Sequence, residues 1–141
     1  MLKVVYDTNV VVSALLSSRG IPALLLDLVF NKRISLFLSL AIFEEYSGVL
    51  GRPKFHIPKR QRATVLRQLR FLAHWVEPEQ RISIASDPDD NIFLECAVAS
   101  GVDFIVTGNL RHFPKTIGQI QIVNPRQFLD IYLRSVFEDD I

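Results

Sequence analysis

The chain has 141 residues, of which 49% are hydrophobic and 22% are charged, a balance typical of a globular protein. A chain of this length forms one domain whose core needs no disulfide, and its single cysteine, Cys96, has no partner for an internal one. No apolar segment approaches the roughly 18 residues needed to cross a bilayer, and the N-terminal residues lack the pattern of a secretion signal. We therefore expect a cytoplasmic protein with one domain over residues 1–141 and no membrane association.

The net charge of +1 conceals an uneven distribution. Residues 46–76 contain no acid, and their seven cations are Arg52, Lys54, Lys59, Arg60, Arg62, Arg67 and Arg70. The acids gather elsewhere, in Glu44–Glu45, in Asp87–Asp90 and in an acidic tip at Glu138-Asp139-Asp140. One region is thus suited to phosphates and another to cations. The slight excess of apolar residues also favours self-association, as a homodimer or a higher homo-oligomer.

Apolar spacing predicts an alternation of strands and helices. In chain order we expect a strand at 2–6, helices near 10–16 and 22–30, a strand at 34–38, a helix at 40–50, a basic helix after Pro58, a helix from 87 to 100, strands at 104–106 and 120–123, and a helix after Asn124-Pro125. Such alternation predicts a three-layer α/β fold with a mostly parallel sheet and helices on both faces. The two helices between 40 and 72 interrupt it and should protrude. Trp75 follows them among apolar residues and is expected in the core rather than stacked on a base.

Asp7 directly follows the first strand, and Thr8 and Asn9 open the next helix. Leaving a buried charge without a partner costs about 3–5 kcal/mol, so such a carboxylate needs a cation, a metal or several donors. The first cation after it in the chain is Arg19. Two interpretations remain open for Asp7: a helix N-cap and a metal ligand.

Three further polar side chains are predicted at the same edge of the sheet. In an open parallel sheet, ligands bind beyond the carboxyl ends of the strands. Asp90 opens the helix before strand 104–106, Asn109 follows that strand, and Glu45 lies about one and a half turns into the helix after strand 34–38. With Asp7 they form a set of hard oxygen ligands, which favours Mg²⁺ or Mn²⁺. A carboxylate-held ion beside a basic surface suits phosphodiester hydrolysis.

The other acids and the histidines have structural interpretations. We expect Asp87 to be an N-cap, Asp103 a turn residue, and Asp89 and Glu44 exposed. The histidines, His56, His74 and His112, lack metal-ligand spacing and are expected at the surface or half-buried, although His112 could approach a substrate.

Four segments, in order, resemble the motifs of PIN-domain ribonucleases: Tyr6-Asp7-Thr8-Asn9, Glu44-Glu45-Tyr46, Asp87-Pro88-Asp89-Asp90-Asn91 and Ile105-Val106-Thr107-Gly108-Asn109. They span nearly the whole chain, and the similarity is greatest to VapC-like toxins of prokaryotic toxin-antitoxin pairs. The resemblance implies a single PIN-like domain, an endoribonuclease dependent on Mg²⁺ or Mn²⁺, an RNA substrate and a small antitoxin partner.

The resemblance also implies site residues by position. The catalytic positions are Asp7, Glu45, Asp90 and Asn109, and the first three would hold the metal. Asp90 is preferred to its acidic neighbours because it precedes Gly101 by eleven residues, and Glu45 is preferred to Glu44 because it directly precedes Tyr46. The supporting polar positions are Thr8, Asn9 and Thr107. Asn109 stands where an Asp is commonest, which leaves open whether one metal ion binds or two.

The basic segment is the predicted RNA-facing surface, through Arg52, Lys54, Arg60, Arg62 and Arg67, because clustered cations attract phosphates regardless of base sequence. A solvated helix face is the alternative. The chain fits a receiver domain poorly, because such a domain needs an acidic pair after the first strand. It also fits poorly to a phosphatase with a nucleophilic Asp, which would need a second acid at the position of Asn9. A catalytically weak PIN-type module for RNA binding or processing remains the stronger alternative to an enzyme.

Overall fold

The computed structural model describes residues 1–139, and residue 140 of the predicted acidic tip lies outside this range. Within it, six strands form one sheet in the order β3-β2-β1-β4-β6-β5. Their bounds are Lys3–Tyr6 (β1), Ser35–Leu38 (β2), His74–Trp75 (β3), Phe104–Val106 (β4), Thr116–Ile117 (β5) and Ile120–Val123 (β6). Only β5 pairs antiparallel with its neighbour; the other pairs are parallel. The predicted α/β class with a mostly parallel sheet is confirmed.

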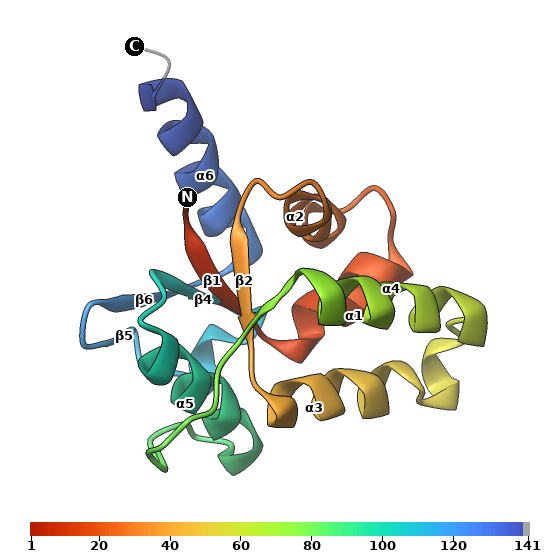
Figure 1. Ribbon diagram of the computed structural model, residues 1–141, viewed down its shortest axis with the longest axis horizontal. Helices are drawn as coiled ribbons and strands as arrows, with labels where there is room; N and C mark the ends of the chain where they lie inside the picture. Colours follow the sequence, from red (N-terminus) through yellow and green to blue (C-terminus); the bar gives the residue numbers. More distant parts are fainter. Residues whose placement is uncertain (140–141) are drawn as a thin grey trace.

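Helices cover both faces of the sheet and extend beyond it (Figure 1). The α-helices are Thr8–Leu16 (α1), Ile21–Phe30 (α2), Leu40–Leu50 (α3), Lys59–Leu72 (α4), Asn91–Ser100 (α5) and Pro125–Asp139 (α6), with short 3₁₀ helices at Pro53–Phe55 (η1), Pro88–Asp90 (η2) and Leu110–His112 (η3). In Figure 1, α3 and α4 project together to one side, which confirms the protruding pair. The second half of α6 projects separately, at the top of this view.

Buried tyrosines hold the end of β1 in place. Tyr6, fully buried, donates a 2.9 Å hydrogen bond from its hydroxyl to the carbonyl of Leu25 in α2. The hydroxyl of Tyr46 in α3 donates to the carbonyl of Tyr6. Phe128 of α6 packs edge-on against Tyr6 with 6.5 Å between ring centroids. Helices α2, α3 and α6 therefore all fix the backbone that immediately precedes Asp7.

No single helix among residues 1–139 is both long enough and apolar enough to span a bilayer. Helices α1 and α2 reach the required length only together, with a bend of 104° between them.

Trp75 is not in the core, contrary to the prediction. Helix α4 ends at Leu72 and the chain turns into the edge strand β3, where Trp75 is 42% exposed. Its ring packs edge-on against Phe43, and its Nε1 donates to the carbonyl of Arg70.

The helix predicted to start at Asp87 is divided: η2 comes first, and α5 begins at Asn91.

Candidate active site

Asp7 is buried at the carboxyl end of β1, where its environment is set by β4. The backbone N–H of Asp7 donates to the carbonyl of Val106, which continues the β1–β4 pairing past the end of the strand. The side chain occupies the N-cap position of α1 but makes no capping bond. Instead, its Oδ2 accepts hydrogen bonds from Thr107 Oγ1 at 2.7 Å and from Asn9 Nδ2 at 3.2 Å. Both bonds end on Oδ2, so Oδ1 is the oxygen left for a cation.

The loop after β4 is fastened to α1 by further hydrogen bonds. Asn9 Oδ1 accepts from the backbone N–H of Gly108, and Thr107 Oγ1 accepts from that of Asn109, both at 3.0 Å. A Cβ at Gly108 would lie 3.4 Å from Asn9 Oδ1, which is ordinary van der Waals contact, so this hydrogen bond does not require glycine. Thr8 Oγ1 is buried without a hydrogen-bond partner among residues 1–139. The three predicted supporting residues thus all lie next to Asp7 in the chain or in space.

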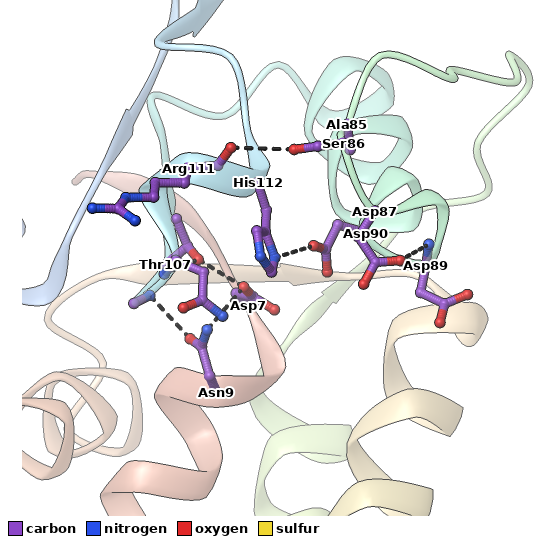
Figure 2. Close-up of polar contacts among 12 residues, drawn as sticks. Asp7, Asn9, Ala85, Ser86, Asp87, Asp89, Asp90, Thr107, Arg111 and His112 are labelled. Carbon is purple, nitrogen blue, oxygen red and sulfur yellow. Dashed lines mark hydrogen bonds and ion pairs between the residues drawn. The ribbon is translucent and has the colours of Figure 1, made fainter.

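A second polar group lies beside Asp7 (Figure 2). Asp90 Oδ2 is 3.2 Å from His112 Nδ1, and Asp87 Oδ1 caps η2 by accepting from the backbone N–H of Asp89. Asp87, Asp90 and His112 each offer one ligand atom, and these atoms lie within 4.8 Å of one another. In the view of Figure 2, Asp7 sits between Thr107 and Asn9 on one side and the Asp90–His112 pair on the other. The predicted role of Asp87 as an N-cap is confirmed, and the structure also makes Asp87 a candidate metal ligand.

The sequence did not identify Asp87 and His112 as candidate ligands. The 3₁₀ turn η3 returns the chain toward η2, and no periodic pattern announces so short a turn. Two hydrogen bonds hold the segments together, from the Ser86 backbone N–H to the His112 carbonyl at 3.0 Å and from Ser86 Oγ to the Arg111 carbonyl at 3.1 Å. One signal in the sequence could have identified His112. It lies three residues after Asn109, in the segment that follows strand 104–106 and was predicted at the carboxyl-end edge of the sheet.

Glu45 faces the same acidic region from α3. Burial raises the pKa of Glu45, nearby Arg52 opposes this, and the charges of Asp89 and Asp90 add to it. Burial likewise raises the pKa of Asp7 to about 6; the bond from Thr107 opposes the rise, and the charges of Asp90 and Glu45 contribute to it. The charge of Asp90 therefore raises the pKa of both Asp7 and Glu45, and that of Glu45 raises the pKa of Asp7. Among the described residues, however, neither Asp7 nor Glu45 belongs to a group of three side chains within ligand spacing, and their metal-binding roles remain predictions.

The donor set fits a divalent cation. Among the side chains described for residues 1–138, the contact between His112 and Asp90 is the only one that brings a basic and an acidic group closer than 4.0 Å, so the buried Asp7 has no cationic partner there. Burial also raises the pKa of Asp90, against the opposing effect of His112. The charges of Asp90 and Glu45 raise the pKa of Asp7, and a cation bound among these three carboxylates would offset that repulsion.

The predicted RNA-binding cations lie on the protruding pair. The side chains of Arg52, Lys54, Arg60 and Arg67 are exposed. Arg62 is half-buried, and its Nη1 donates at 3.3 Å to the carbonyl of Ile57, so part of its role is structural. Of these residues, Arg52 is the one whose charge acts on Glu45. Exposure alone is compatible both with RNA binding and with a solvated helix face.

Carboxylates that gather beyond the carboxyl ends of the central strands of a parallel sheet lie where such sheets bind their ligands, and they can hold a divalent cation there. The family model for the PIN domain matches residues 3–111, more than half of the chain, and the chain belongs to this family. PIN domains are generally nucleases that use divalent metals, which makes a nucleic acid the expected class of substrate. The chain is also similar to MJ1680, an uncharacterized protein of Methanocaldococcus jannaschii, with 32% identity over 147 aligned residues that cover 96% of this chain and 94% of the relative.

Proposed function

We propose that this protein is a Mg²⁺- or Mn²⁺-dependent endoribonuclease. The observation that carries the proposal is Asp7, a buried carboxylate with no cationic partner among the described residues, fixed through one oxygen by Thr107 and Asn9 and influenced by the charges of Asp90 and Glu45. A divalent ion bound there would lower the pKa of a water molecule and neutralise charge that develops on the phosphate. The hydrogen bonds to Oδ2 orient the carboxylate, and its burial excludes competing solvent.

The protruding helices supply the proposed contact with RNA. Arg52 lies where α3 ends, close enough to influence Glu45, and the exposed Arg60 and Arg67 continue the positive surface along α4. An RNA phosphate bound at Arg52 would bring the neighbouring phosphodiester close to Glu45 and the other site carboxylates. Contacts of this kind read charge rather than bases.

A circular single-stranded RNA tests the endonuclease step directly, because it has no ends for an exonuclease. We expect linear product in Mg²⁺ or Mn²⁺, none with a chelator, and none from a circular single-stranded DNA of the same sequence. Binding of the circle without cleavage would favour the alternative, a PIN-type module for RNA binding or processing. Cleavage restricted to linear RNA would contradict the proposed endonuclease.

The similarity to VapC-like proteins supports a narrower role, as the toxin of a toxin-antitoxin pair that acts on RNA in the cytoplasm. A small antitoxin encoded by an adjacent gene would be its partner. Expression of the protein alone should then arrest growth, and co-expression of the neighbouring gene should relieve the arrest. Growth unaffected by the active enzyme would leave an RNA-processing role.

Helix α6 supports the proposed homo-oligomer. The second half of this helix projects from the molecule (Figure 1). It carries the exposed apolar side chains of Leu133, Val136 and Phe137, and their spacing in the sequence puts them on one side of the helix. A second copy would cover them. Changing Val136 and Phe137 to Glu should yield monomers in sedimentation velocity, whereas Phe71→Glu, on the exposed face of α4, should not.

A further inference from the structure

The group formed by Asp87, Asp90 and His112 differs chemically from the rest of the site. Asp7 and Glu45 offer only oxygen, whereas this group adds an imidazole nitrogen to two carboxylates. The carboxylate of Asp90 is 15% exposed and the His112 ring 43%, so the ligand atoms are reachable from solvent.

The positions of these atoms suit a shared ion. Metal–ligand bonds from His and Asp are about 2.0–2.2 Å long, so ligand atoms on one ion lie roughly 3–4 Å apart. The three ligand atoms are already within 4.8 Å of one another, and small side-chain rotations would complete the site. Asp87 Oδ1 accepts from the backbone of Asp89, which fixes the carboxylate and leaves Oδ2 for a ligand bond. The backbone on both sides is tied through Ser86, so the segments need not move.

The ion expected there follows from charge and ligand softness. Two carboxylates supply −2, which balances a divalent ion when the imidazole is neutral. Imidazole nitrogen suits Zn²⁺ and other first-row transition metals, while Mg²⁺ strongly prefers oxygen and retains its water. A site with a nitrogen ligand therefore discriminates against Mg²⁺.

We propose that Asp87, Asp90 and His112 form a transition-metal site that binds Zn²⁺ or Mn²⁺ in preference to Mg²⁺. The inference deepens the proposed function, on which it rests for its catalytic meaning: Asp90 would be shared between this ion and the one beside Asp7. His112 would then supply the protein ligand that the uncharged Asn109 does not. Binding itself is measurable without RNA.

Titration calorimetry of the whole protein with Zn²⁺, Mn²⁺ and Mg²⁺ tests the site. The informative variants are His112→Asn, which removes the nitrogen ligand, and Asp87→Ser, which keeps a residue able to cap η2 while removing the carboxylate. The matched control is His56→Asn, because His56 is an exposed residue directly after η1 with a φ of 52°, a conformation that Asn tolerates. We expect each site variant to lose about 100-fold or more in Zn²⁺ affinity. Losing a residue that only hydrogen-bonds a metal ligand costs about 10- to 100-fold, and losing a ligand itself should cost at least as much.

The same titrations contain the outcomes that overturn the proposal. Mg²⁺ affinity should change by less than about threefold in His112→Asn, because Mg²⁺ takes oxygen ligands. Unchanged Zn²⁺ affinity in that variant, or equal affinity of the wild type for Zn²⁺ and Mg²⁺, would reduce His112 to a hydrogen-bond partner of Asp90. If a variant fails to fold, the ring-nitrogen NMR signals of wild-type His112 decide, since they must shift on Zn²⁺ addition. RNA cleavage by the wild type in Mg²⁺ alone, with no His112-dependent Zn²⁺ step, would end this inference and leave the proposed function intact.

Discussion

Thr107 Oγ1 donates a 2.7 Å hydrogen bond to Asp7 Oδ2, across one hundred positions of sequence. The same hydroxyl accepts from the backbone N–H of Asn109, so its proton is directed at the carboxylate. The β1–β4 pairing makes this contact possible, because the two residues follow adjacent parallel strands. One side chain thus orients the central acid and the loop that carries the fourth predicted position.

Replacing Thr107 tests that arrangement. Thr107→Val keeps the shape but removes the hydroxyl, so it should raise the pKa of Asp7 further and weaken divalent-ion binding about 10- to 100-fold. Thr107→Ser keeps the donor and should stay near the wild type. Calorimetric titration with Mn²⁺ compares the three proteins. Equal affinities would show that Thr107 has only a packing role.

Asp7→Asn should abolish RNA cleavage while making the metal-free protein more stable. The amide cannot replace the charge that holds a cation, and we expect a loss of more than about 100-fold in turnover. The folded protein no longer has to bury an ionised group, so the midpoint of thermal unfolding at neutral pH should rise. Asp27→Asn, on the exposed face of α2, is the matched control. Activity of Asp7→Asn at the wild-type rate would remove Asp7 from the catalytic set.

The pKa of Asp7 also predicts how stability depends on pH. Burial raises it from 3.8 to about 6, so between these values the folded protein holds a proton that the unfolded chain has released. The stabilisation is complete below about pH 4 and is lost as the pH rises through about 6, by at most about 3 kcal/mol. Denaturant unfolding of the metal-free wild type and of Asp7→Asn across this range isolates the effect as their difference. A difference that is constant with pH would contradict the buried, ionisable state.

The charge of the basic surface should set its affinity for RNA. Changing Arg60 and Arg67 to Glu should weaken binding and lower the salt-dependence slope by roughly 0.7 for each phosphate of a single strand that the protein no longer neutralises. Arg62 is left unchanged because its hydrogen bond to Ile57 would confound the result. Lys32→Glu with Arg33→Glu, an equal charge change before β2, is the control. If both pairs lower affinity equally, the basic helices only contribute net charge.

The fold was largely predictable because its signals are local, whereas the site depends on contacts that no local signal carries. Long apolar runs and helix caps predict β1, α3 and α6. The strands β3 and β5 have two residues each and are too short to show a hydrophobic periodicity. The position of Asp7 directly after the first strand was enough to predict it at the carboxyl-end edge of the sheet. The approach of His112 to Asp90 depends on a 3₁₀ turn and on two bonds from Ser86, and side-chain spacing in the sequence does not reveal either.

Asn109→Asp should strengthen the binding of a second divalent ion. Asn109 is exposed at the end of the loop that Thr107 and Asn9 hold against α1, and its backbone N–H, rather than its side chain, makes the contact with Thr107. Without Asp87, the acids Asp7, Glu45 and Asp90 supply −3 against the +4 of two divalent ions, and a carboxylate at position 109 would add a fourth negative charge. Without RNA, whose phosphate would otherwise provide the missing charge, the variant should show a distinct second Mn²⁺ step in calorimetry, about 10-fold tighter than in the wild type. Asn109→Ser, equally short and uncharged, should not. The same number of ions bound with the same affinity in all three proteins would place Asn109 outside the metal site and assign it to the turn after β4.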